Sequence, residues 1–220
     1  KILDDISFSA KKGQIIGITG AVACGKSTLG KAFLCEYPYE GHITVDGAEL
    51  QNMEQSVRTG IVGYLGHDPE LFNDSVENNV LLGNSKNSDT YLNAACMKQE
   101  VAEMTDGKNT LIGSGGAYLS GGQAKRLAFA RTLCHDKPIL ILDDPFSALD
   151  RKTEDTVFAN LQEYVKNKTV FLISHRLYHF PQMRQVIFME NGKTAVGTHA
   201  ELMASVPVYR QLYESQTGGT

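Results

Sequence analysis

The chain has 220 residues, of which 42% are hydrophobic and 21% are charged, a composition typical of a soluble globular protein. Its formal net charge is −4 with no long block of one sign, so we expect no nucleic-acid partner. No apolar run approaches the roughly 20 residues of a membrane-spanning helix. The cysteines show neither metal-ligand spacing nor the density of a disulfide scaffold, which predicts four free thiols, Cys24, Cys35, Cys96 and Cys134.

Strand-like runs separated by turn residues recur along the chain, at 15–19, 42–45, 60–65, 139–142 and 169–173. Helical patterns lie between several of them, and this alternation predicts an α/β fold with a mainly parallel sheet. From 68 to 116 there is no convincing strand, and helical segments near 75–82 and 88–104 predict an inserted helical subdomain.

The last third of the chain continues the same pattern. Apolar residues from 157 to 165 fall on one helix face, and the strand at 169–173 completes a βαβ unit. The run VIFMENGKTAV, 186–196, predicts a strand, an Asn-Gly turn and a second strand, hence an antiparallel portion of the sheet. Short helices are expected from 199 to 214.

The run GAVACGKST matches the phosphate-loop pattern G-x-x-x-x-G-K-[ST] in full and follows the apolar stretch QIIGIT. Such a loop leaves a strand, wraps nucleotide phosphates with backbone N–H groups, and enters a helix whose positive end faces the anion. Lys26 is expected to reach the β and γ phosphates, and the hydroxyl of Ser27 to ligate Mg²⁺. A chance glycine-rich turn is the alternative. The predicted nucleotide-binding residues here are Gly20, Ala21, Val22, Ala23, Cys24, Gly25, Lys26, Ser27 and Thr28.

Two carboxylates, Asp143 and Asp144, follow the apolar run 139–142 at the carboxyl end of a predicted buried strand. Ligand sites of open α/β sheets lie at that edge. Asp143 suits the Mg²⁺ shell, directly or through water, because hard cations take oxygen ligands. Asp144 is then expected beside the attacking water. A solvated acidic pair at a strand end is the alternative.

The run LSGGQ precedes a stretch with helical spacing, AKRLAFARTL. Its glycines and its serine stand at a predicted helix start, where backbone donors and a hydroxyl can hold an anion. A plain capped helix would show the same five residues, so the run is weak when taken alone. The residues predicted to contact a nucleotide are Leu119, Ser120, Gly121, Gly122 and Gln123.

With a phosphate loop upstream and ILILDD just downstream of LSGGQ, the chain resembles the nucleotide-binding domain of ATP-binding cassette (ABC) exporters over essentially its whole length. The resemblance implies a RecA-like P-loop NTPase core at about 1–67 and 127–220, with the helical subdomain at about 68–126. It implies ATP and Mg²⁺ as ligands and ATP hydrolysis as the reaction. In that family two such domains meet head to tail, and the phosphate loop of one and the LSGGQ of the other enclose each ATP.

Further roles follow from the resemblance alone. Ser147–Asp150 resembles the loop that crosses the dimer interface, with Asp150 near the nucleotide, and His175 resembles the switch histidine that contacts the γ phosphate. A surface histidine is the alternative for His175. The family's partners include transmembrane domains, so this domain is expected at the cytoplasmic face of the cell membrane, as a peripheral part of an integral membrane transporter. The remaining histidines, which carry no spacing signal and are expected to be solvated, include His42, His135, His179 and His199.

Three positions depart from the family pattern. His67 stands at the expected glutamine of VGYLGHDPELF, where the family residue makes metal and catalytic contacts. Asp144 stands at the catalytic glutamate and is one methylene shorter, which withdraws the carboxylate by about an ångström from the water, so slow hydrolysis is expected. Ser114, in TLIGSGG, replaces a usual acidic residue in the loop expected to contact the transmembrane helices.

Because the altered residues belong with the phosphate loop while LSGGQ is intact, we expect a non-identical partner, with one site that hydrolyses and a Lys26 site that mostly holds ATP. A homodimer with two slow sites is the alternative. The family's adenine-stacking aromatic and six membrane helices would precede Lys1, and Phe8 is interpreted as packing. Two other functions stay open: a nucleotide-gated regulatory module with little turnover, and a soluble relative acting on DNA or ribosomes, against which the short spacing from His67 to LSGGQ argues.

Overall fold

The computed structural model describes residues 3–113, 116–190 and 192–218, so Ser114 and the Asn191 of the predicted turn lie outside the described residues. By their contacts the residues divide into two compact units. A sheet unit comprises Lys1–Tyr64, Pro138–Asp144 and Val165–Thr220, and a helical unit comprises Leu65–Lys137 and Pro145–Tyr164.

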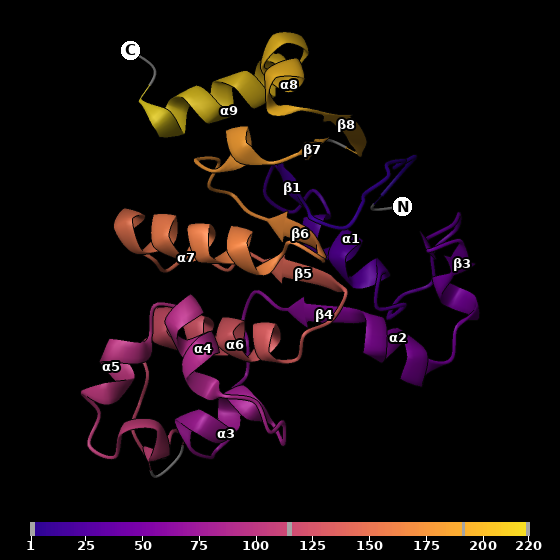
Figure 1. Cartoon of the computed structure of the whole chain (residues 1–220). Coiled ribbons are helices and arrows are strands. Elements are labelled where there is room, and N and C mark those ends of the chain that lie inside the picture. The colour runs from indigo at the N-terminus through magenta and orange to yellow at the C-terminus, as the bar shows by residue number, and fades with distance from the viewer. Residues whose placement is uncertain (1–2, 114–115, 191, 219–220) are drawn as a thin grey trace. The chain divides into compact units, whose positions relative to one another are not determined.

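The main sheet is mostly parallel (Figure 1). The strands are β1 (Gln14–Gly20), β2 (Thr44–Val45), β3 (Ala48–Glu49), β4 (Val62–Leu65), β5 (Ile139–Asp143), β6 (Thr169–Ile173), β7 (Gln185–Glu190) and β8 (Lys193–Gly197). Among the described residues the main sheet has six strands in the order β4-β5-β6-β1-β7-β8. Strands β5, β6, β1 and β7 run parallel, and β8 runs antiparallel to β7. The predicted mainly parallel sheet with an antiparallel portion is confirmed.

The helices fall into two sets. The sheet unit holds α1 (Lys26–Ala32), the 3₁₀ turn Leu50–Asn52, α2 (Gln55–Ile61), the 3₁₀ turn Phe180–Gln182, α8 (His199–Ser205) and α9 (Pro207–Thr217). The helical unit holds α3 (Val76–Leu81), α4 (Ser88–Ala94), α5 (Lys98–Ala102), the 3₁₀ turn Gly107–Asn109, α6 (Gly121–Cys134) and α7 (Arg151–Tyr164).

The central strands are buried along nearly their whole length, which explains their unbroken apolar runs, since parallel strands are covered on both faces. On one face Ile16 and Ile18 pack in the core of the sheet unit. On the other, a Cβ added to Gly17 would lie 2.6 Å from the sulfur of Met183, so that position has no room for a side chain. The ring of Phe8 packs edge-to-face against the ring of Phe171, with 5.7 Å between the ring centroids, and this confirms the packing role of Phe8.

Two predicted strands were misplaced. The run at 60–65 becomes a strand only at Val62, because the two residues before it complete α2. The run at 42–45 forms only the two-residue β2, which pairs with β3 across a turn at Asp46 and Gly47. Both turn residues have positive φ, 50° and 82°. An Asp-Gly pair is a strong hairpin signal, and here it forms the turn between β2 and β3.

The predicted helix at 75–82 is confirmed as α3, with the Ser75 side chain accepting from the Asn78 N–H at its start. The single helix expected at 88–104 is wrong, because the chain breaks at Cys96, whose φ is 53°. Carbonyl groups freed by the break are satisfied from elsewhere in the helical unit. Arg126 donates to the Cys96 oxygen at 2.8 Å, and Asn160 donates to that of Ala94 at 3.1 Å.

The helical unit is larger than the predicted subdomain at 68–126, because α6 continues to Cys134 and the Tyr164 hydroxyl of α7 donates to the Leu133 carbonyl. The limits of the inserted subdomain itself stay a prediction. Helices α8 and α9 confirm the predicted helical end of the chain. In the ranges described, no helix combines the length and the apolar character needed to span a membrane.

The four cysteines are free, as predicted. Of the histidines expected to be solvated, His42 is exposed, but His179 is only 5% exposed. His135 and His199 are partly buried, and the ring of His199 packs against Tyr209. The expectation was wrong for these three, because spacing carries no information on burial when a histidine packs against distant elements.

Candidate nucleotide site

The phosphate loop joins β1 to α1, and its two glycines are required by the backbone. A Cβ on Gly20 would lie 1.9 Å from the Met189 carbonyl oxygen, so this glycine allows a close approach to β7. Gly25 precedes α1 with φ 100°, which glycine adopts freely. Ala23 is also left-handed, with φ 62°, and costs about 1 kcal/mol there because it carries a Cβ. The loop is therefore a fixed, partly strained turn.

Lys26 is a buried cation with neutral partners. Its side chain is almost enclosed, since the residue is 6% exposed. The ammonium donates to the Ala21 carbonyl at 2.7 Å, to the Gly20 carbonyl at 3.1 Å and to the Cys24 sulfur at 3.7 Å. A buried charge without an opposite charge is costly, and an anion at the loop would relieve that cost.

The groups predicted to hold Mg²⁺ fit a hard cation. Ser27 is exposed at the first turn of α1, and Asp143 ends β5 at 3% exposure. The Tyr64 hydroxyl donates to the Asp143 carboxylate at 3.1 Å, and burial, followed by the charge of Asp143, raises the pKa of Tyr64, so it stays a donor. Magnesium in a nucleotide complex takes few protein oxygens besides phosphates and waters. Among the described residues there is no group of three or more His, Cys, Asp or Glu side chains that could hold a metal ion.

Asp144 and His175 follow paired strands. The Asp144 N–H donates to the Ile173 carbonyl at 2.8 Å, and Asp143 stands opposite Ile173 in the β5–β6 register. His175 follows that strand by two residues and is exposed. Because β1 pairs with β6 on the other side, the structure brings the phosphate loop, the two aspartates and the His175 segment to one edge of the sheet. The arrangement suits the binding of a triphosphate and a metal ion. It also offers a hydrogen-bond donor for the negative charge that develops on a phosphate during its transfer.

The backbone at Asp144 explains part of its identity. Its φ is 51°, in the left-handed region, where aspartate is tolerated better than most residues. The residue is 6% exposed, so its carboxylate is largely enclosed. The left-handed backbone therefore suits aspartate better than glutamate at this position.

The LSGGQ run starts α6 with a complete capping box. The Ser120 hydroxyl accepts from the Gln123 N–H at 3.2 Å, and the Gln123 side chain accepts from the Ser120 N–H at 2.9 Å. The amide of Gln123 also donates to Glu100 at 3.0 Å. Arg126 donates to both oxygens of Glu100, at 2.5 and 2.9 Å, and these hydrogen bonds are the main cause of the lowered pKa of Glu100. Within its own chain the run is thus a capped helix.

The two glycines of the run differ. A Cβ on Gly122 would lie 3.0 Å from the Ala148 carbonyl, so this glycine admits the neighbouring loop. A Cβ on Gly121 would meet no described atom within 4 Å. Glycine inside a helix costs about 1 kcal/mol relative to alanine. Packing within the described chain gives no reason for Gly121.

Two further predicted site residues lie in the helical unit. Asp150 caps α7, since its carboxylate accepts from the Thr153 N–H at 3.0 Å and hydroxyl at 2.6 Å, and these bonds lower its pKa. His67 is exposed, and the loop after it is held by Asn79, which bonds the N–H and the carbonyl of Phe72 at 2.8 and 2.9 Å. The contacts of His67 and Asp150 with a nucleotide stay predictions.

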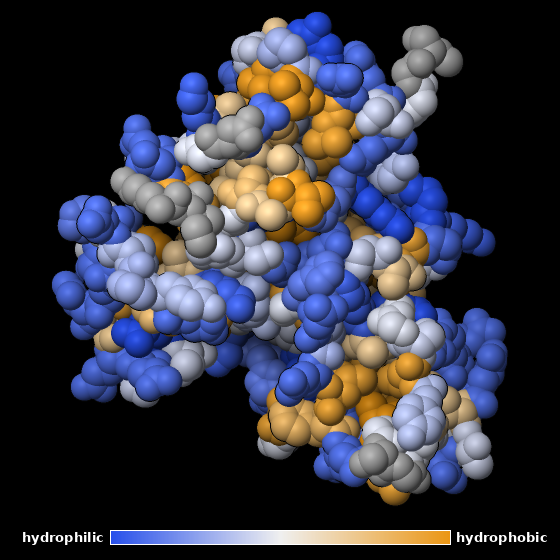
Figure 2. All heavy atoms as spheres, turned by 180° about the vertical axis from the view of Figure 1, so that it is seen from behind, coloured by the Kyte–Doolittle hydropathy of each residue, from blue (hydrophilic) through white to orange (hydrophobic). Residues whose placement is uncertain are grey.

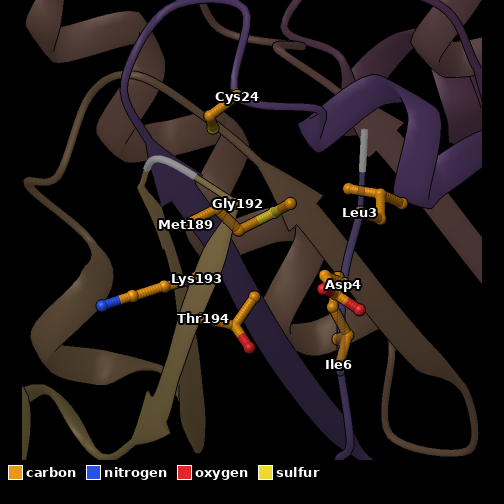
Figure 3. A pocket seen from close by; sticks show the side chains of 8 residues that line it. All are labelled: Leu3, Asp4, Ile6, Cys24, Met189, Gly192, Lys193 and Thr194. Atoms are coloured by element: carbon orange, nitrogen blue, oxygen red, sulfur yellow. The ribbon is translucent and has the colours of Figure 1, made fainter. Parts of the chain in front are cut away.

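A small hollow opens beside the phosphate loop, between the N-terminal segment and the β7–β8 hairpin (Figure 3). Its lining residues are Leu3, Asp4, Ile6, Cys24, Met189, Gly192, Lys193 and Thr194. Its enclosed volume is about 0 Å³, far below the roughly 300 Å³ at which ligand pockets begin, so we assign it no ligand.

The surface is mostly hydrophilic on the face shown in Figure 2, with apolar side chains gathered in small groups. Two large side chains on the candidate binding elements are strongly exposed. Val22, in the phosphate loop, is 84% exposed, and Tyr118, just before LSGGQ, is 87% exposed. The phosphate loop and the start of α6 are both open to an approaching molecule.

A phosphate loop after the central strand β1, with an aspartate pair at the end of β5, the next strand but one in the parallel sheet, defines a P-loop nucleotide-binding protein. The chain matches the family model described as "ABC transporter" over residues 3–147. The chain therefore belongs to the ABC transporter family.

Relatives of known name agree with this assignment. The chain is 38% identical to the "Probable multidrug resistance ABC transporter ATP-binding/permease protein YheI" of Bacillus subtilis, covering 97% of this chain and 38% of that protein. It is 36% identical to the "ATP-dependent lipid A-core flippase" of Salmonella typhimurium, and the match covers 98% of this chain and 38% of that protein. A solved structure titled "Structure of a bacterial Atm1-family ABC exporter with ATP bound" superposes with a TM-score of 0.91 at 30% identity, covering 98% of this chain and 39% of that one.

The chain spans less than two fifths of the length of these relatives. It is a nucleotide-binding domain of the exporter type and an ABC-class ATPase, with the predicted P-loop NTPase fold.

Proposed function

We propose that this domain binds MgATP and, paired with a second nucleotide-binding domain, powers export through transmembrane domains from the cytoplasmic face of a cell membrane. The observation that carries the proposal is Lys26, a buried cation whose partners in the described chain are two carbonyls and a thiol. A triphosphate would supply the charge that this ammonium lacks. The relatives named above are membrane transporters, which supports the export role.

At the site, each group of the sheet unit has a task. Lys26 binds the β and γ phosphates, and Ser27 and Asp143 hold Mg²⁺ by their oxygens. Tyr64 keeps the Asp143 carboxylate in place through its 3.1 Å hydrogen bond. His175 donates to the γ phosphate, and Asp144 orients the water.

The start of α6 serves the partner's nucleotide. Gly121 leaves open space where an alanine would be better for the helix, which makes sense if a phosphate of another subunit approaches there. Ser120 is exposed beside it, with backbone N–H groups of a 14-residue helix behind it.

The two faces of the domain differ in their fitness for catalysis. The α6 start is complete, whereas Asp144 and His67 replace a longer carboxylate and a glutamine at the domain's own site. A non-identical partner gives this asymmetry a use: the partner's site hydrolyses ATP, and the Lys26 site mostly holds it and stabilises the closed dimer.

The decisive experiment changes Ser120 in the complex with its partner. Ser120→Arg places bulk and a long side chain at the partner's ATP. Ser120→Asp keeps a good helix cap but repels the phosphates, so a loss of activity cannot be blamed on an uncapped α6. Steady-state ATP turnover is expected to fall nearly to zero with both, while Ser120→Thr, which keeps the hydroxyl and the cap, stays close to wild type.

The outcomes separate the alternatives. If turnover falls only by half, both sites are competent and the asymmetric model is wrong. If the unaltered complex itself shows almost no turnover while binding ATP tightly, the domain is a nucleotide-gated regulatory module instead.

A further inference from the structure

One side chain of the C-terminal helix holds the main chain that carries His175. Gln216, near the end of α9, donates its side-chain N–H to the His175 carbonyl at 2.8 Å. Its side-chain oxygen accepts from the Leu177 N–H at 2.9 Å. The amide thus bonds the peptide groups on either side of Arg176, as a neighbouring β-strand would.

The sheet holds the same segment from the other direction. Ser174 is 1% exposed and donates its N–H to the Ile18 carbonyl of β1 at 3.0 Å, and its hydroxyl accepts from the Arg176 N–H at 3.0 Å. Leu177 is fully buried. The backbone from Ser174 to Leu177 is therefore fixed at several points, while the His175 side chain is exposed.

Helix α9 is anchored without Gln216. Tyr209 is fully buried, its ring lies 5.6 Å from that of Phe188 in β7, and its hydroxyl is 2.7 Å from Nδ1 of His199. Arg210 also ties the helix to the Met203 carbonyl at 2.6 Å. A change at Gln216 is thus expected to free the His175 segment without undocking the helix.

We propose that Gln216 is a positioning residue for ATP hydrolysis: it sets the main chain of His175 so that the imidazole meets the γ phosphate. The inference rests on the proposed role of His175. Glutamine suits this task because its amide offers a donor and an acceptor at once. Glutamate lacks the donor, and asparagine is one methylene shorter. The C-terminal helix then takes part in catalysis without touching the nucleotide.

The test uses the full transporter with its partner, in which Ser120→Asp silences the partner's site and leaves the Lys26 site to be measured. Single-turnover hydrolysis of radiolabelled ATP is compared among Gln216→Ala, Gln216→Glu and Gln211→Ala, an exposed glutamine of the same helix. We expect about a tenfold loss of rate for Gln216→Ala, because small displacements of a catalytic group are costly. Gln216→Glu, which keeps the acceptor for Leu177, should lose less, and Gln211→Ala nothing. ATP affinity should change less than about twofold, since binding rests on the loop.

A double-mutant cycle of Gln216 and His175 separates positioning from general stability. His175→Ala should lower the rate, and Gln216→Ala should add nothing in that background. The inference is wrong if Gln216→Ala lowers the hydrolysis rate by the same factor in the His175→Ala background as in the wild type. It is also wrong if Gln216→Ala does not lower the rate in the wild type. In both cases the proposed function stands. If His175→Ala leaves the rate unchanged, or the Lys26 site shows no hydrolysis, the role of His175 is wrong and the inference falls with it.

Hydrogen exchange gives a readout that does not depend on turnover. The Leu177 amide should exchange about tenfold faster or more in Gln216→Ala, because its acceptor is gone, and should be unchanged in Gln211→Ala. Unchanged protection at Leu177 would also overturn the proposal.

Discussion

Each unit holds a cation that is largely shielded from solvent, and the two cations differ in what surrounds them. In the helical unit Arg126, whose side chain is 11% exposed, makes two hydrogen bonds to the Glu100 carboxylate. In the sheet unit Lys26 is 6% exposed, and its partners among the described residues carry no negative charge. Removing a cation that is already paired leaves a carboxylate without its partner, whereas a cation with neutral partners supports the proposal that a charged ligand binds beside it.

The strongest test of this comparison removes the sheet-unit cation. Lys26→Ala should abolish tight MgATP binding, a loss of about 3 to 5 kcal/mol, because the phosphates lose their buried partner. The unfolding temperature without nucleotide should hardly fall, since the substitution also removes a buried charge. Titration calorimetry and thermal unfolding measure the two effects. Lys31→Ala, on the same helix with a side chain 38% exposed, is the control. Equal ATP affinity in Lys26→Ala would contradict the assignment of the site.

Removing the helical-unit cation should give the opposite result. Arg126→Ala leaves Glu100 without its partner and should lower the free energy of unfolding by about 2 kcal/mol, less than for a fully buried pair because the Glu100 side chain is 36% exposed. MgATP affinity at the phosphate loop should stay unchanged. Urea unfolding measures the free energy of unfolding, and titration calorimetry measures the MgATP affinity. A loss of ATP affinity at normal stability would mean that the two cations do not have separate roles.

A smaller effect is expected from lengthening the carboxylate beside the proposed attacking water. Asp144→Glu should raise hydrolysis at the Lys26 site with ATP affinity nearly unchanged, and His67→Gln should raise it further. The gain should not exceed about tenfold, because a glutamate at φ 51° costs about 1 kcal/mol. Asp46→Glu, at φ 50° in the β2–β3 turn, measures that backbone cost away from the site. If neither change raises the rate in single-turnover assays, the site is limited by another step, such as dimer reopening.

The smallest predicted effect concerns acid. The hydrogen bonds from Arg126 lower the pKa of Glu100 in the folded chain. A lowered folded-state pKa adds stability above the unfolded value of about 4.3, and that stability is lost as the pH falls through the folded value. The difference in unfolding temperature between wild type and Glu100→Gln should therefore be constant near neutral pH and shrink below about pH 4. A difference that grew in acid would show that Arg126 does not stabilise the charged carboxylate.

The sequence predicted those parts of the fold and site that depend on local patterns. The phosphate loop, the buried strands and the helix after LSGGQ all have a period or a motif confined to a few residues, and the structure confirms each element. The break at Cys96 had no such signal, because it is stabilised by Arg126 and Asn160 from distant helices.

The residues that support the site were missed for the same reason. Tyr64, Glu100 and Gln216 act through partners far along the chain. Tyr64 lies within the run VGYLGHDPELF, but no motif position indicated a role for any of the three. Only the register of strands and the docking of helices bring such pairs together. The one local hint was Tyr64, which lies in a strand. Its hydrogen bond to Asp143 could be foreseen only if the order of strands, with β4 beside β5, were known.

The strand order also governs when the site can form as the chain is made. Gln14 of β1 pairs with Thr169 of β6, so the phosphate loop leaves the ribosome long before the strand that flanks it. Until then the apolar strand β1 has no partner on that side and needs protection from aggregation. A nascent chain that ends before Thr169 carries the whole phosphate-loop motif but not the sheet edge that gives it a function.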